Sequence, residues 1–237
     1  MAPKLHKLKE RKEIFGGRMR IMHNKFDIQV ERKHYFKEYD NLLKFCYYYY
    51  YQIALTQDLN PKSILEIGIG NKMYYNYLKE NGYNITSCDF DKQLNPDFVA
   101  DIRNLPFEKN SFEVVSAFEV LEHLPFSEVP KALIELRKVT SKYCFISIPY
   151  RSATFEITLR FPFIGKILKK PFIDLFWRIP LRPKDISFEG EHYWEIGTKS
   201  YPLKRIRKLI SNCGFIIEKE VRPVLDVSSY FFVLKKI

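Results

Sequence analysis

The hexapeptide FEVLEH places two carboxylates and an imidazole close together, at Glu119, Glu122 and His123. If this stretch starts a helix, the i, i+3 and i+4 spacing turns the three side chains toward one side. Such a group can be a solvated helix face, a general-base cluster or a set of metal ligands. The hexapeptide alone leaves all three interpretations open, so the elements around it must decide between them.

The composition is that of an ordinary folded protein. The 237 residues are 46% hydrophobic and 28% charged, which suits one sizeable core. No apolar run reaches the roughly 18–20 residues of a membrane-spanning helix, and the N-terminus lacks the apolar region of a secretory signal. Four widely spaced cysteines without a CxxC pair indicate a reducing compartment. We therefore expect a cytoplasmic protein, either free or peripherally bound to a membrane.

Short apolar strands alternate with helical stretches from residue 62 onward. This alternation predicts right-handed crossovers and a parallel sheet covered on both faces, and two final strands joined by a turn add an antiparallel pair. We therefore predict an α/β fold, namely a Rossmann-like, doubly wound, seven-stranded mixed sheet with an antiparallel C-terminal hairpin. The expected strands are residues 63–69, 84–90, 97–101, 111–118, 142–150, 215–223 and 228–236, and the expected helices are 72–80, 127–140 and 201–214.

Two segments stand outside this alternation. Residues 1–58 read as a basic N-terminal arm and a helix from about Lys33 to Thr56, whose five consecutive tyrosines favour packing on a sheet edge over a stacking platform. Residues 151–190 are aromatic and basic, and three prolines at nine-residue intervals divide them. Because proline breaks helices, we expect two short amphipathic pieces there and not one long helix.

A candidate ligand site follows the first two strands of the alternation. Glu66, Gly68 and Gly70 stand at the end of the first strand, where glycine lets a backbone approach a ligand closely. Asp89 ends the second strand, and a carboxylate there suits bidentate hydrogen bonding to a ribose diol. The nicotinamide fingerprint GxGxxG fails at Met73, and a Walker lysine loop is absent.

Several motifs in this order resemble those of class I S-adenosylmethionine-dependent methyltransferases of the type 11 group. The matching stretches are LEIGIGN, SCDFD and ADIRNLPFEKNSFEVVSAFEVLEHLP, over roughly residues 60–150. The resemblance implies S-adenosylmethionine as cofactor, a methyltransferase domain at 59–237 and a substrate lid at about 151–190. It also implies the cofactor-binding residues Glu66, Gly68 and Gly70 for the methionine part, Asp89 for the ribose, Asp101 and Ile102 for the adenine, and Phe118 for no particular part of the cofactor.

The fuller motif E-x-x-E-H resembles two groups of metal-dependent O-methyltransferases, those of the ubiquinone pathway and the small-RNA 3′-terminal 2′-O-methyltransferases. In the RNA group a downstream histidine completes the metal site, and GEHYWEIG supplies His192 in a similar setting. The resemblance implies four metal ligands, Glu119, Glu122, His123 and His192. Two carboxylates suit Mg²⁺, whereas two imidazoles shift the preference toward Mn²⁺, Fe²⁺ or Co²⁺.

The sequence thus predicts an O-methyltransferase that acts on a sugar, a glycan or another small vicinal diol, assisted by Mg²⁺ or Mn²⁺. A metal lowers the pKa of the acceptor hydroxyl, and His123, His192 or Glu119 takes the proton. Three alternatives stay open: an RNA ribose 2′-O-methyltransferase, a metal-free enzyme with a histidine base, and a non-catalytic protein of the same fold. The net charge of +11 suits RNA, an anionic sugar or a membrane surface contacted through residues 157–182.

Overall fold

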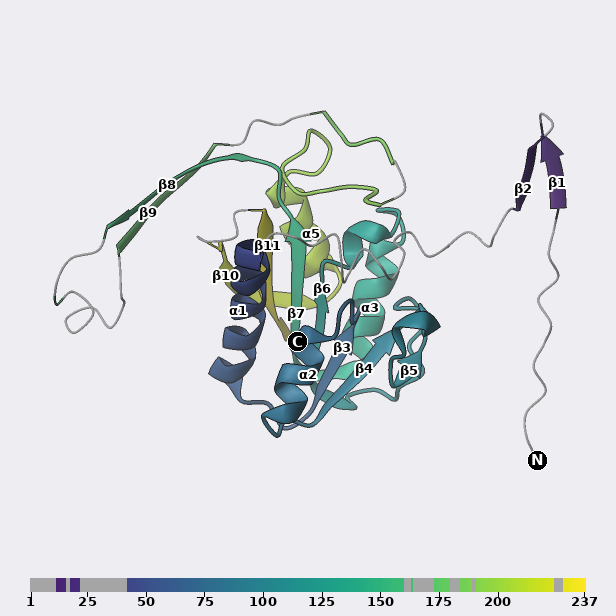
Figure 1. Ribbon diagram of the computed structural model, residues 1–237, viewed down its shortest axis with the longest axis horizontal. Helices are drawn as coiled ribbons and strands as arrows, with labels where there is room; N and C mark the ends of the chain where they lie inside the picture. The colour runs from purple at the N-terminus through teal and green to yellow at the C-terminus, as the bar shows by residue number, and fades with distance from the viewer. Residues whose placement is uncertain are drawn as a thin grey trace.

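A seven-stranded sheet forms the centre of the part of the chain that this computed structural model describes (Figure 1). The described residues are 12–15, 18–21, 42–159, 163, 173–179, 184–188, 191–223 and 228–237. The strand order is β10-β11-β7-β6-β3-β4-β5, with β7 to β5 parallel and β11 antiparallel to both of its neighbours. This arrangement confirms the predicted mixed sheet with an antiparallel C-terminal hairpin.

The strands of this sheet follow from short apolar runs. All four residues of β3 are buried, as expected for a strand inside a parallel sheet that is covered on both faces. The strand bounds are β3 Ile64–Ile67, β4 Ile85–Asp89, β5 Phe98–Val99, β6 Phe112–Phe118, β7 Thr140–Pro149, β10 Phe215–Val221 and β11 Ser229–Lys236. Outside this sheet, β1 Lys12–Phe15 and β2 Arg18–Ile21 form an antiparallel pair within the N-terminal arm.

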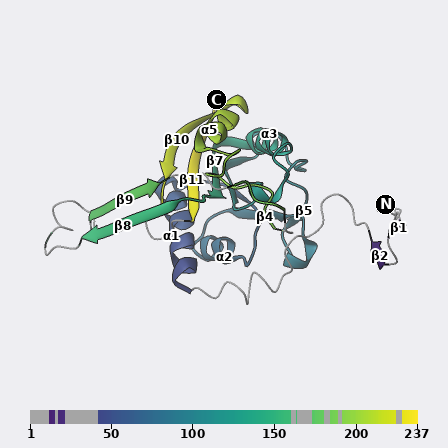
Figure 2. The ribbon, with the colours of Figure 1, turned by 90° about the horizontal axis from the view of Figure 1, so that it is seen from above.

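Helices cover both faces of the sheet, with α1 and α2 on one side and α3 and α5 on the other (Figure 2). Their apolar stripes pack on the strands and bury one core layer on each face of the sheet. The helix bounds are α1 Leu42–Leu59, α2 Met73–Glu80, α3 Val129–Val139 and α5 Leu203–Asn212, with the short 3₁₀ turns η2 Lys92–Leu94 and η3 Leu121–His123. No helix in these described ranges is long and apolar enough to cross a membrane.

The tyrosine-rich helix α1 packs on the sheet, as its sequence predicted. The rings of Tyr48 and Tyr51 each lie 6.0 Å from the ring of Phe231 on β11, between centroids. The hydroxyl groups of Thr56 and Tyr74 are 2.7 Å apart and join α1 to α2. The predicted helix start near Lys33 lies outside the described residues, and the proposed boundary at residue 58 stays a prediction.

The insertion at 151–190 contains two strands, β8 Ala153–Leu159 and β9 Ile173–Ile179, which pair antiparallel. The two short amphipathic pieces predicted from the prolines are therefore strands of one hairpin. In β8, Phe155, Ile157 and Leu159 alternate with Thr and Glu, a period of two that suits a strand, whereas Phe176 interrupts the alternation in β9. Pro180 directly follows β9. The hairpin projects from the sheet in both ribbon views (Figures 1 and 2).

Candidate active site

The loop after β3 comes close to the turn after β6. Gly68 has a φ of +78°, and a Cβ atom on it would lie 2.4 Å from Cγ2 of Val120. Both the backbone conformation and the lack of space therefore require glycine. The positive φ of Gly70, +46°, turns the same loop toward α2. This loop lies at the carboxyl ends of the parallel strands, where ligands of such sheets bind.

Two backbone amides orient the carboxylate of Asp89, which is predicted to bind a ribose. Its Oδ2 accepts a hydrogen bond from the Ile69 amide at 2.9 Å, and its Oδ1 accepts one from the Asp91 amide at 2.8 Å. Burial raises the pKa of Asp89, although these hydrogen bonds lower it in part. The carboxylate is therefore fixed in direction, and each oxygen keeps a second lone pair for a ligand hydroxyl.

Glu66 brings a second buried carboxylate to the same strand ends. It is 5% exposed, and its Oε2 has no hydrogen-bond partner among the described residues. Burial, and next the charge of Asp89, raise the pKa of Glu66 well above its ordinary value. An unpartnered buried carboxylate fits a ligand that carries a positive charge, such as the ammonium of a methionine group. The residues present therefore fit S-adenosylmethionine.

The other three predicted cofactor-binding residues have different surroundings. Asp101 binds Arg103, whose Nε lies 2.8 Å from Oδ1, and Ile102 is buried. Phe118 is buried too, and its ring packs 5.4 Å from that of Tyr74 on α2, between centroids. Their contacts with the cofactor stay predictions.

FEVLEH does not start an α-helix, so the i, i+3 and i+4 spacing does not by itself turn its three side chains toward one side. Glu119 has a φ of +52°, which breaks any helix at its first residue, and η3 provides a single 3₁₀ turn before α3 begins at Val129. The Glu119 amide donates to the hydroxyl of Ser147 on β7 at 3.0 Å. Glu119 is therefore a strained turn residue directly after β6, and Glu122 and His123 follow in η3.

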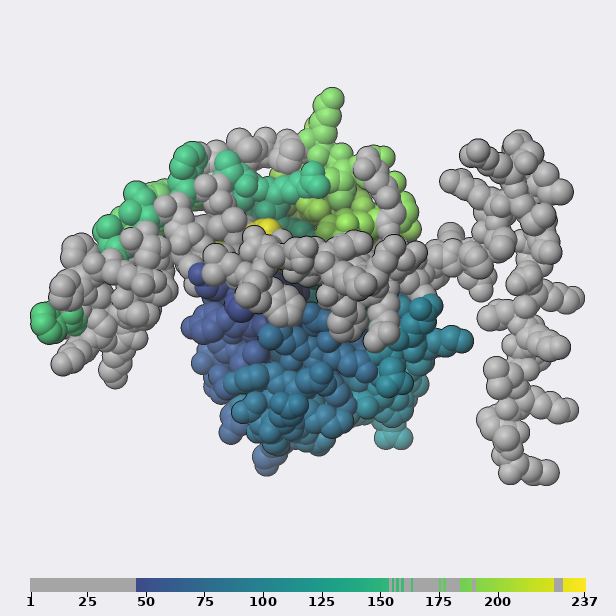
Figure 3. Space-filling view, viewed as in Figure 1, coloured from purple at the N-terminus to yellow at the C-terminus, as the bar shows by residue number. Residues whose placement is uncertain are grey.

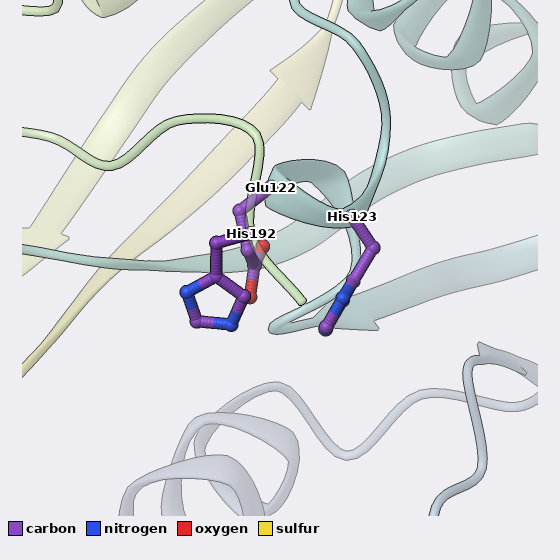
Figure 4. A group of neighbouring side chains, drawn as sticks. All are labelled: Glu122, His123 and His192. Atoms are coloured by element: carbon purple, nitrogen blue, oxygen red, sulfur yellow. The ribbon is translucent and has the colours of Figure 1, made fainter. Parts of the chain in front are cut away.

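Three of the four predicted metal ligands nevertheless come together (Figure 4). One ligand atom each from Glu122, His123 and His192 lies within 4.8 Å of the others, the only such group of His, Cys, Asp and Glu found in the described part of the chain. Glu119 is not in this group. The two imidazole rings are 4.9 Å apart between centroids and meet edge to face.

Glu122 is the buried member of this group. It is fully buried, and neither of its carboxylate oxygens has a hydrogen-bond partner within the described residues. Burial is the largest cause that raises the pKa of Glu122, and the charge of Glu119 is the next. A buried carboxylate with both oxygens unpartnered is costly, and a bound cation removes that cost.

Both histidines present a nitrogen lone pair to the group. Nδ1 of His123 lies 3.0 Å from the backbone oxygen of Glu191, and Nδ1 of His192 lies 2.9 Å from Oε1 of Glu195. Because both oxygens are acceptors, these contacts favour a proton on Nδ1 of each ring, and a ring that carries its proton there has its lone pair on Nε2. This is the arrangement that ligating histidines adopt in metal sites.

A carboxylate and a guanidinium that sequence reasoning missed support His192. Oε2 of Glu195 accepts from Nε of Arg151 at 2.5 Å, while Oε1 faces His192. Burial alone would raise the pKa of Glu195, but hydrogen bonds from His192 and Arg151 lower it below its ordinary value. The i, i+3 spacing of His192 and Glu195 in EHYWE was the available signal, whereas nothing in the sequence pointed to Arg151.

The residues after His192 fasten it beside η3. The Tyr193 amide donates to the backbone oxygen of Glu122 at 2.9 Å, and the buried Trp194 donates from Nε1 to the backbone oxygen of Leu124 at 3.1 Å. Ile196 forms a bridge with Tyr150 at the end of β7. Two segments far apart in the sequence are thereby held in one site.

A cleft of about 330 Å³ opens beside His192. Its lining combines donors, carboxylates and one apolar side chain, namely Arg151, Ile186, Ser187, Glu191, His192 and Glu195. Both ends of the 151–190 insertion thus contribute to the cleft. The predicted role of the insertion as a substrate lid stays a prediction.

Comparisons with known proteins agree with this fold. Residues 65–147 match the family model described as methyltransferase domain. No curated protein matches the sequence. A solved S-adenosylmethionine-dependent methyltransferase from Clostridium acetobutylicum superposes with a TM-score of 0.56 at 10% identity, over 86% of this chain and 96% of that one.

Two further solved structures contain a bound cofactor product. Magnesium protoporphyrin IX methyltransferase from Synechocystis with bound SAH is similar with a TM-score of 0.56 at 16% identity, over 89% of this chain and 90% of that one. The 1,6-didemethyltoxoflavin-N1-methyltransferase of Burkholderia thailandensis, with bound S-adenosylhomocysteine, has a TM-score of 0.54 at 12% identity, over 83% and 79%. At such identities these likenesses establish the fold.

Residues 65–147 thus match a methyltransferase domain, and the fold is that of S-adenosylmethionine-dependent methyltransferases, as the motifs predicted. The chain therefore carries a methyltransferase domain, and the buried carboxylates of Glu66 and Asp89 fit S-adenosylmethionine.

Proposed function

We propose that this enzyme is a metal-assisted O-methyltransferase whose acceptor is a vicinal diol on a sugar, a glycan or another small molecule. One observation carries the proposal: the Glu122 carboxylate, buried and unpartnered, faces two imidazoles whose Nδ1 atoms are engaged elsewhere. A solvated helix face would not be buried, and a histidine base would not need a second histidine and a bare carboxylate beside it.

Glu122, His123 and His192 would hold the ion. One carboxylate and two imidazoles suit Mn²⁺ or another first-row divalent ion better than Mg²⁺. The bound ion would lower the pKa of an acceptor hydroxyl and so prepare it to attack the sulfonium methyl group. Two adjacent hydroxyls can bind one ion together, which is why we assign a diol as acceptor.

The remaining residues of the site have distinct tasks. Glu119 lies close enough to raise the pKa of Glu122, and with the three ligands assigned it is the carboxylate left to accept the hydroxyl proton. Arg151 and Ser187 line the cleft and offer hydrogen-bond donors to the acceptor. Glu195 keeps His192 in the tautomer that presents Nε2.

The test is methyl transfer from labelled S-adenosylmethionine to matched acceptors, with Mn²⁺ and with a chelator. We expect transfer to sugars that carry a free vicinal diol, little transfer to the corresponding deoxy sugars, and loss of transfer in the chelator. Transfer that survives the chelator would exclude metal assistance. Equal transfer to diol and deoxy acceptors would exclude the diol requirement, and transfer confined to RNA 3′ ends would exclude a small-molecule acceptor.

A further inference from the structure

The hairpin β8–β9 carries an exposed apolar face. The register pairs Phe155 with Trp177 and Ile157 with Leu175 across the two strands. Side chains at every second position of a strand lie on the same face, so these four form one surface. Their exposed fractions are 59%, 52%, 49% and 41%, respectively, values far above those of core residues.

This face lies on a part of the molecule that stands clear of the sheet. In the space-filling view the described residues of the hairpin extend beyond the body of the domain (Figure 3). A two-stranded ribbon is marginally stable alone in water, and a contiguous exposed apolar surface on a soluble protein marks a contact site. A partner that covers the apolar face would stabilise the ribbon.

Charge identifies the kind of partner. Residues 160–172, which join the two strands, include four Lys or Arg and no Asp or Glu. Phe163 in this stretch is 75% exposed. Aromatic and aliphatic side chains next to basic ones match the boundary between lipid headgroups and acyl chains in an anionic bilayer. A second copy of this chain, with the same net charge of +11, would instead be repelled.

We propose that β8–β9 docks its apolar face on an anionic lipid bilayer. The four apolar side chains enter the boundary region, and the basic residues of 160–172 interact with anionic headgroups. β8 begins two residues after Arg151, which lines the cleft beside His192. A seven-residue strand spans about 23 Å, so docking would hold the cleft within roughly that distance of the lipid surface.

Vesicle flotation of the full chain tests this directly. Phosphatidylcholine vesicles are compared with vesicles that also contain 30 mol% phosphatidylglycerol, for wild type, the F155S/W177S double variant and the control I216S. Ile216 is 52% exposed on β10, so I216S removes an equally exposed apolar side chain from the domain body. We expect wild type and I216S to float with the anionic vesicles, and the double variant to lose about tenfold or more of the bound fraction.

A second readout follows the hairpin itself. Of the two tryptophans, Trp194 is fully buried and Trp177 is 52% exposed, so a blue shift of the fluorescence on adding anionic vesicles reports Trp177. Absence of flotation and of the shift in wild type would overturn the proposal. So would equal losses in I216S and the double variant, or a dimer in sedimentation that the double variant abolishes. H192A should float like wild type, which separates this result from the proposed metal chemistry.

Discussion

Nδ1 of His192 lies 2.9 Å from Oε1 of Glu195, and this contact directs the other imidazole nitrogen toward Glu122 and His123. The same carboxylate accepts a hydrogen bond from Arg151 at 2.5 Å through its second oxygen. Glu195 is thus fixed from two sides and determines both the tautomer and the direction of the His192 ring. A pocket wall would need neither property, whereas a ligating histidine needs both.

Replacing Glu195 by Gln should weaken metal binding without affecting the cofactor. The glutamine side chain forms a weaker hydrogen bond with the His192 ring and cannot form the ion pair with Arg151. We therefore expect the Mn²⁺ affinity to fall about ten- to a hundredfold. Calorimetric titrations of Mn²⁺ and of S-adenosylhomocysteine measure the two affinities separately. E218Q removes the same charge from an exposed position on β10 and should change neither. Unchanged Mn²⁺ affinity in E195Q would mean that Glu195 does not support a ligand.

Replacing Gly68 by Ala should weaken cofactor binding and should cost more stability than the positive φ alone explains. Gly68 and Gly82 have similar φ values, +78° and +83°, but only at Gly68 would a Cβ meet a neighbour, namely Val120. We expect G82A to cost about 1 kcal/mol of stability, and G68A to cost more and to weaken S-adenosylhomocysteine binding. Thermal unfolding and calorimetry compare the pair. Equal effects of the two variants would show that close approach at Gly68 is unimportant.

Replacing Asp89 by Ala should abolish cofactor binding. The carboxylate is buried and oriented by the amides of Ile69 and Asp91, so it is poised to accept from a ribose diol. We expect S-adenosylhomocysteine affinity to fall about a hundredfold or more. D58A, which removes an exposed carboxylate from α1, is the control. If D89A bound the cofactor like D58A while folded by circular dichroism, the assigned ribose contact would be wrong.

The ion pair between α5 and β10 predicts a pH-dependent stability. Arg207 contacts both carboxylate oxygens of Glu220, at 2.7 and 2.6 Å, and the hydroxyl of Tyr230 donates to the same group. The Arg207 hydrogen bond is the largest cause that lowers the pKa of Glu220 in the folded protein. A lowered folded-state pKa stabilises the protein above the ordinary value of about 4.3, and this contribution is lost as the pH falls through the folded-state value.

E220Q should therefore destabilise the protein by about 1 kcal/mol at pH 7, a modest value because Arg207 is partly exposed. The difference from wild type should shrink toward zero in acid. Urea unfolding of wild type, E220Q and the control E218Q at several pH values measures this. A destabilisation of E220Q that is independent of pH would assign the effect to packing and not to charge.

The sequence predicted the sheet well because its central strands β3, β4, β6 and β7 are short runs of mostly buried residues between polar stretches. The β8–β9 hairpin was predicted only as two amphipathic pieces. Its alternating Phe, Ile and Leu residues, interrupted by prolines, fit a short helix as well as a strand. The i, i+3 and i+4 spacing of FEVLEH could not place its side chains, because that spacing has meaning only on a helix, and the positive φ of Glu119 excludes one. Three of the four predicted ligands nevertheless lie together.

His192 was predicted as a ligand from its position in EHYWE, but the side chains that orient its ring were not predicted. Arg151 and Glu195 form their ion pair across the insertion, where a contact depends on how β7 and the returning chain meet at Tyr150 and Ile196. Such a contact has no local pattern in a single sequence. Nothing in the sequence indicated that both carboxylate oxygens of Glu122 would be buried without a hydrogen-bond partner among the described residues.

The central claim is that Glu122, His123 and His192 bind a divalent ion. The most direct test is calorimetric titration of Mn²⁺ into the full chain saturated with S-adenosylhomocysteine, for wild type and H192A. We predict saturable binding of one ion in wild type and its loss in H192A, with unchanged affinity for S-adenosylhomocysteine. Absence of binding in wild type, or equal binding in H192A, would contradict the claim.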